Sequence, residues 1–80
     1  MREWLSQAAD KLAASLGDEP SAYELTDEEI ERLLDLARIA ARESGDRTNA
    51  PLVCYLLGLA HGQHQERTVT DLVARVTGGS

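Results

Sequence analysis

Residues 26–45 read TDEEIERLLDLARIAARESG and contain the clearest helix signals in the chain. Thr26 followed by Glu29 matches a capping box, in which the two residues satisfy each other's free backbone N–H groups. The acidic residues directly after Thr26 fall where the helix dipole favours negative charge. Gly45 supplies a stop. One face collects apolar residues at helical spacing: Ile30, Leu33, Leu34, Ala37, Ala40 and Ala41. These signals predict a helix over residues 27–44.

The next segment, PLVCYLLGLA at residues 51–60, has no polar face. Pro51 suits a first helical turn, where its missing N–H is not needed. A helix that is apolar all round is normally covered on most sides. The run is about half the length needed to cross a bilayer, so a core helix is favoured over a membrane span. We therefore expect a buried central helix over residues 51–63.

Two further helices flank this pair. Apolar residues at helical spacing predict a helix over about 2–16, which Gly17 ends because glycine enters the left-handed cap without steric cost. Thr68 is a suitable N-cap for a short helix over 69–76. Its valines and threonines would also suit a strand, but no partner strand is visible. The prediction is an all-α, compact four-helix domain spanning residues 1–80, with a buried third helix.

Composition excludes several classes of protein. The chain of 80 residues has 14 acidic and 8 basic side chains, a net charge of -6, and would repel a nucleic-acid backbone. No apolar run is long enough for a membrane span. The first residues lack the pattern of a secretory signal. The single cysteine, Cys54, rules out an intrachain disulfide, and we expect a cytoplasmic protein.

Side chains that could perform chemistry are few. His61 and His64 have a spacing that can place two imidazoles on one metal, but further ligands are not evident, and both suit an exposed helix end. Cys54 lies among apolar residues, which favours core packing over nucleophilic reactivity. The chain contains none of the nucleophile-elbow, zinc-protease, redox-cysteine or P-loop patterns. We therefore predict a protein that is not an enzyme and has neither metal nor cofactor.

Two surface features could bind other molecules. The basic residues Arg38, Arg42 and Arg47, with Asn49 at the next helix start, could hold a small anion. The alternative is a solvated face with local pairs such as Asp35 with Arg38.

The second feature is apolar. Leu36 and Ile39 fall off the main stripe of the 27–44 helix, and with Trp4 they could form a partner surface or a homodimer contact. The alternatives are scattered exposed residues, a buried helix end, and a Trp4 that faces the core. Gly58 and Gly62 have the spacing that lets another helix approach closely.

The segments LLDLAR at 33–38, NAPL at 49–52 and LLGLAHG at 56–62, together with Trp4 and Leu5, carry a family resemblance. The chain resembles a small actinobacterial helical domain of unknown function that occurs alone or fused to the molybdenum cofactor guanylyltransferase. The resemblance implies an accessory or interaction domain linked to molybdenum cofactor biosynthesis, which contacts the guanylyltransferase or a molybdoenzyme. Its shared motifs carry over no catalytic residue, and they match here at Asp35, Arg38, Asn49 and Pro51.

Overall fold

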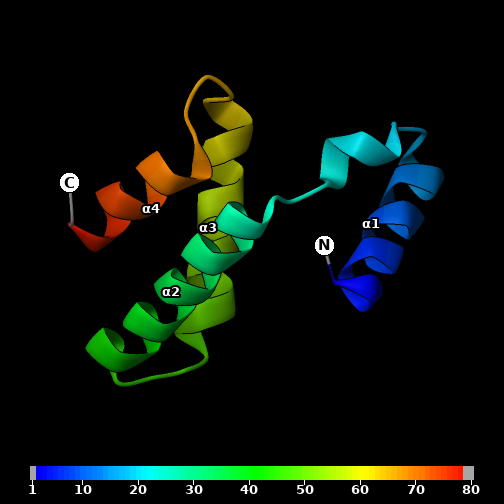
Figure 1. Ribbon diagram of the computed structural model, residues 1–80. Helices are drawn as coiled ribbons and strands as arrows, with labels where there is room; N and C mark the ends of the chain where they lie inside the picture. Colours follow the sequence, from blue (N-terminus) through cyan, green and yellow to red (C-terminus); the bar gives the residue numbers. More distant parts are fainter. Residues whose placement is uncertain (1, 79–80) are drawn as a thin grey trace.

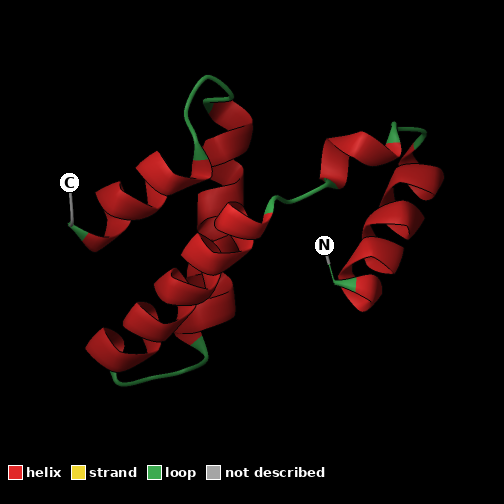
Figure 2. Cartoon of the chain, viewed as in Figure 1, coloured by secondary structure: helices red, strands yellow, loops and turns green. Residues whose placement is uncertain are grey.

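The computed structural model describes residues 2–78, which form helices and loops and contain no strand (Figure 1, Figure 2). The elements are α1 (Glu3–Leu16), the 3-10 helix η1 (Pro20–Tyr23), α2 (Asp27–Ser44), α3 (Asn49–Gln63) and α4 (Val69–Thr77). The predicted all-α class with four helices is confirmed. The segment after Thr68 is a helix, as expected.

Local side-chain hydrogen bonds begin α2 and α4. The hydroxyl of Thr26 accepts a hydrogen bond from the Glu29 N–H at 3.1 Å, and the Glu29 carboxylate accepts one from the Thr26 N–H at 2.8 Å. This is the predicted capping box. Thr68 caps α4 in the same way, since its hydroxyl accepts from the Asp71 N–H at 3.0 Å.

The structure departs from the sequence-based expectation by more than one residue at the start of α3 and at residues 20–23. A hydrogen bond from the Asn49 N–H to the Asp46 carbonyl, at 3.1 Å, lets α3 begin two residues before Pro51. Residues 20–23 form the 3-10 helix η1, which the sequence pattern did not predict; Pro20 presets the backbone angle of its first position. Both differences concern a single turn of backbone.

The core lies where α2, α3 and α4 meet. Its buried residues are Leu36 from α2, Leu57 from α3, and Val69, Leu72 and Val73 from α4. Leu33, Val53, Cys54 and Ala60 pack around them. The Thr70 hydroxyl also donates a hydrogen bond to the Glu28 carboxylate at 2.9 Å, which joins the first turns of α4 and α2.

The prediction that the third helix is buried is wrong. Only Leu57 of α3 is buried, while four large side chains on its opposite side are 50–68% exposed: Leu52, Tyr55, Leu56 and Leu59. α2 and α4 pack against one side of α3, and α1 does not cover the other. The expected close approach at Gly58 and Gly62 is also not found within the chain. A Cβ atom added at either glycine would have no neighbour within 4 Å beyond its own helix.

The first helix stands apart from the other three. It packs against η1, an extended segment leads from η1 to α2, and no Cα atom of α1 lies within 8 Å of α2, α3 or α4 (Figure 1). α1 buries only Ala9 and Ala13. The radius of gyration is 13.2 Å, whereas a compact chain of this length has about 11.6 Å. Residues 3–23, α1 together with η1, are called the α1 arm below.

Candidate functional site

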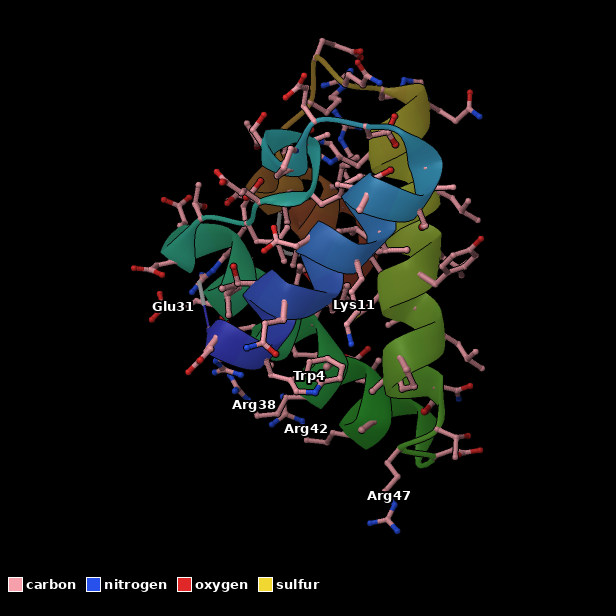
Figure 3. The ribbon with its side chains drawn as sticks, turned by 90° about the vertical axis from the view of Figure 1, so that its right-hand side faces the viewer. Trp4, Lys11, Glu31, Arg38, Arg42 and Arg47 are labelled. Carbon is pink, nitrogen blue, oxygen red and sulfur yellow. The ribbon has the colours of Figure 1, made fainter. Side chains whose placement is uncertain are left out.

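The three predicted anion-binding arginines lie along one end of the molecule. Arg38 and Arg42 extend from α2 and Arg47 from the following loop, and all three are exposed (Figure 3). Arg38 forms an ion pair with Asp35, whose other carboxylate oxygen pairs with Arg32 at 3.0 Å. Among the described residues, Arg42 and Arg47 have no ion-pair partner. The uncommitted positive charge at this end therefore belongs to Arg42 and Arg47.

The start of α3 already holds a carboxylate. Asp46 accepts hydrogen bonds from the Thr48 hydroxyl at 2.7 Å and from the Thr48 N–H at 2.9 Å. These two bonds, the side-chain one first, hold the pKa of Asp46 below its ordinary value of 3.8. Asp46 stays ionised at neutral pH. Its charge opposes the predicted binding of an anion at this helix N-terminus.

Asn49 does not share a site with the three arginines. Its half-buried side chain lines an open hollow between the end of α2 and the start of α3, together with Leu52 and Leu56. None of the three arginines lines that hollow. The structure therefore brings Arg38, Arg42 and Arg47 to one edge but does not join Asn49 to them.

The predicted apolar contact residues have three different environments. Leu36 is 1% exposed at the centre of the core, so the prediction that it contacts a partner is wrong. Ile39 is half-buried in a groove between α2 and α4, beside Val73 and Thr77. Trp4 is 77% exposed on α1, which excludes the alternative that it faces the core. Of these three residues, only Trp4 is exposed enough to contact another molecule.

The histidines and the cysteine do not gather. His61 is half-buried at the end of α3, and His64 faces Glu66 at 3.6 Å. Within residues 2–78, no three histidine, cysteine or acidic side chains come close enough to hold a metal ion. Burial raises the pKa of the Cys54 thiol, which packs against the core with its Sγ 3.8 Å from the Leu33 carbonyl oxygen. The thiol therefore stays protonated and unreactive.

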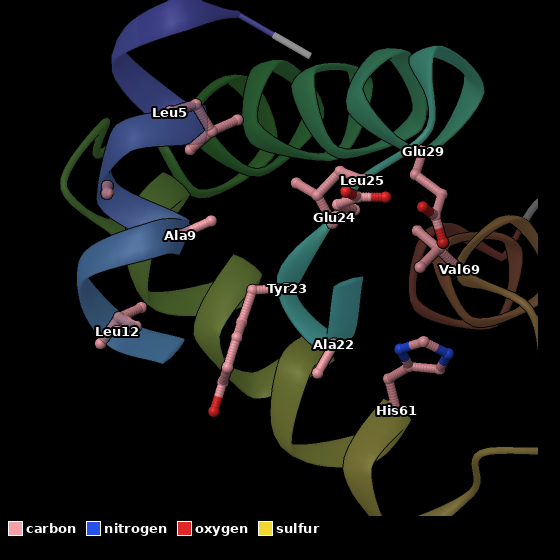
Figure 4. Close-up of a pocket in the computed structure, with 11 residues that line it drawn as sticks. Leu5, Ala9, Leu12, Ala22, Tyr23, Glu24, Leu25, Glu29, His61 and Val69 are labelled. Atoms are coloured by element: carbon pink, nitrogen blue, oxygen red, sulfur yellow. The ribbon is translucent and has the colours of Figure 1, made fainter. Parts of the chain in front are cut away.

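A mainly apolar cavity of about 290 Å³ separates the α1 arm from the three-helix body (Figure 4). Leu5, Ala9 and Leu12 line it from α1, and His61 and Val69 line it from the body. Tyr23 of η1, which also lines the cavity, donates a hydrogen bond to Asp18 at 2.5 Å. This bond raises the pKa of Tyr23 and closes the turn between α1 and η1. The cavity walls therefore belong to two parts of the chain that pack loosely on each other.

Four of the nine exposed large apolar side chains among the described residues lie on α3. The α3 face consists of Leu52, Tyr55, Leu56 and Leu59, which share one side of the helix by their three- and four-residue spacing. It lies opposite the buried Leu57. This face was not predicted from the sequence, because a helix without a polar side was expected to be core throughout. The one available signal was Tyr55, whose hydroxyl needs water or a partner when the ring is on an apolar helix.

None of the helices in residues 2–78 combines the length and hydrophobicity that crossing a bilayer requires. No curated protein and no solved structure matches the chain. One family model does match, over residues 1–79, almost the whole length. The chain therefore belongs to the family described as domain of unknown function DUF6457.

Proposed function

We propose that this chain is a non-enzymatic protein-interaction domain of the cytoplasm that acts alongside the enzymes of molybdenum cofactor biosynthesis. The observation that carries the interaction role is the α3 face, where four large apolar side chains are each at least half exposed. Contiguous apolar surface of this kind is typical of sites where proteins bind one another.

The charged side chains support a role without catalysis. Asp71 pairs with Arg75 at 3.1 Å and with Arg67 at 3.6 Å, and Asp35 bridges Arg32 and Arg38. Such pairs along a helix surface are ordinary solvated contacts. The shifted pKa values of Tyr23, Asp46 and Cys54 each have a local structural cause, and these three residues do not line a common cavity.

The link to molybdenum cofactor biosynthesis rests on the resemblance of residues 33–38, 49–52 and 56–62 to a domain that also occurs fused to the guanylyltransferase. We therefore propose the guanylyltransferase, or a molybdoenzyme that receives the finished cofactor, as the partner.

Calorimetry of the purified domain against the guanylyltransferase of the same organism tests this proposal. We expect saturable binding, which Leu56→Glu abolishes because a charge would be buried without a partner in the contact. Leu34→Glu is the matched control, since Leu34 is an exposed leucine of α2 outside the α3 face. Absence of heat with the guanylyltransferase and with its client molybdoenzymes would remove the proposed link.

A second candidate function is binding of a small anion at the arginine-rich end. The unpaired guanidinium groups of Arg42 and Arg47 favour it, because arginine binds phosphate and carboxylate through paired N–H donors. Titration with inorganic phosphate, followed by NMR, tests it. The double variant Arg42→Ala with Arg47→Ala should lose the shifts, and Arg75→Ala, whose arginine already pairs with Asp71, should keep them. Equal shifts in all proteins would exclude the site.

A further inference from the structure

We propose that the α3 face binds a second copy of this chain, in an antiparallel pair of α3 helices related by a two-fold axis. This inference rests on the proposed function, because it takes the α3 face as an interaction surface and names a second copy of the chain as a molecule that binds there. Spacing, charge and area each support a second copy.

The spacing of the α3 face is the same in both directions along the helix. Leu52 lies three residues before Tyr55, and Leu59 lies three residues after Leu56. An antiparallel second copy therefore sets Leu52 of one chain opposite Leu59 of the other, and Tyr55 opposite Leu56. In a contact related by a two-fold axis, a residue that meets a second residue of the other chain is met in turn by the first residue of that chain. The pairs Leu52 with Leu59 and Tyr55 with Leu56 satisfy this condition.

Charge also favours a second copy at this surface. The chain carries a net charge of -6, so two copies repel one another over most of their surfaces. Residues 49–63 of α3 contain no aspartate, glutamate, lysine or arginine. Contact through α3 therefore buries none of its own residues as an unpaired charge. Glu43 of α2, which lines a hollow together with Leu52 and Leu56, borders the contact.

The exposed area matches a weak, specific dimer. The four exposed fractions, 50–68%, correspond to roughly 450 Å² in each copy, within the range of about 300–600 Å² for the largest apolar patch of a monomer. Complete burial of these four side chains in both copies would cover roughly 900 Å², close to the approximately 1,000 Å² expected of a specific interface. A contact of this size is at the low end for specific interfaces, so we expect a dimer that dissociates on dilution.

Sedimentation velocity over a wide concentration range tests the pair. The mass of the wild-type protein should rise from 8.7 kDa towards twice that value as its concentration increases. Leu56→Glu should weaken the dimer at least about 100-fold, because it places two unpaired charges in the contact. Leu34→Glu should dimerise like the wild type. Circular dichroism shows whether each variant keeps its helices, and Tyr55→Ser serves if Leu56→Glu does not fold.

The outcomes separate this inference from the proposed function. A wild-type mass that stays at 8.7 kDa at every concentration would overturn the dimer. If Leu56→Glu nevertheless lost binding to the guanylyltransferase, the α3 face would still be an interaction surface, and the proposed function would stand. If it kept that binding, both would fall. A dimer that Leu56→Glu leaves intact would place the contact elsewhere and would also overturn the inference.

Discussion

Gly17 and Gly58 occupy opposite kinds of position. Gly17 ends α1 with a φ of 72°, in the left-handed region that a side chain disfavours. Gly58 lies inside α3 with open space where a Cβ atom would be. We expect Gly58→Ala to raise the free energy of unfolding by about 0.5–1 kcal/mol, because alanine loses less conformational freedom in a helix. Gly17→Ala should lower it by about 1 kcal/mol. Urea unfolding of both variants measures the difference.

The Gly58→Ala variant also tests whether a second chain lies against α3. Loss of stability in Gly58→Ala would mean that an atom absent from the monomer, such as one from a second chain, lies against this glycine. Urea unfolding of Gly58→Ala at protein concentrations below and above that of dimer formation separates the effect on the helix itself from a clash with a second chain.

The pKa of Asp46 tests whether the hydrogen bonds from Thr48 form. Hydrogen bonds from Thr48 lower the pKa of Asp46 in the folded protein, so the bonds stabilise the fold above the unfolded pKa. That stability is lost as the pH falls through the folded pKa. We expect Thr48→Val to move the pKa of Asp46 upward, towards its ordinary value, in an NMR titration of the carboxyl carbon. Thr77→Val should leave the curve in place, because the Thr77 hydroxyl binds the Val73 carbonyl instead.

At the scale of single elements, side-chain caps fix where α2 and α4 begin. Thr26→Ala removes one half of the capping box and should lower the free energy of unfolding by about 1 kcal/mol. Chemical denaturation checks this value. Ser21→Ala, an exposed change in η1, should alter it by less than about 0.5 kcal/mol. An equal effect of the two substitutions would show that the Thr26 hydroxyl does not contribute.

At the scale of the whole molecule, the α1 arm and the three-helix body differ in packing. α1 buries two alanines, whereas α2, α3 and α4 share a core of leucines and valines. A helix with few buried apolar contacts opens at a low free-energy cost. We expect amide hydrogens in the middle of α1 to exchange at least about tenfold faster than those around Leu36, a difference of about 1.4 kcal/mol. Equal protection in hydrogen-exchange NMR would contradict the loose attachment of the arm.

The helices themselves could be predicted from the sequence because their signals are local. The Thr26 and Thr68 caps, and the glycines that end α1 and α2, act within one turn of backbone. Predicted and observed ends of the four helices agree to within two residues. η1 was missed because a single 3-10 turn after Pro20 has no hydrophobic period of its own.

The candidate surfaces could be predicted only in part. The arginines are long charged side chains on a polar arc, so their exposure at one end follows from the sequence. The placement of Leu36 does not. Apolar residues cover more than half of the circumference of α2, from Leu34 round to Ile39, and periodicity does not say which part of so wide an arc packs inward.

The sequence by itself determined the helical class, the position of each helix and the absence of charge from residues 49–63. These properties depend on hydrogen bonds and residue types within a few positions of one another. Only the tertiary structure decided that Leu36 is core and that the α3 face is open. An apolar helix becomes buried only when enough neighbours surround it. In this chain α2 and α4 cover one side of α3, while α1 packs on η1 and leaves the other side uncovered.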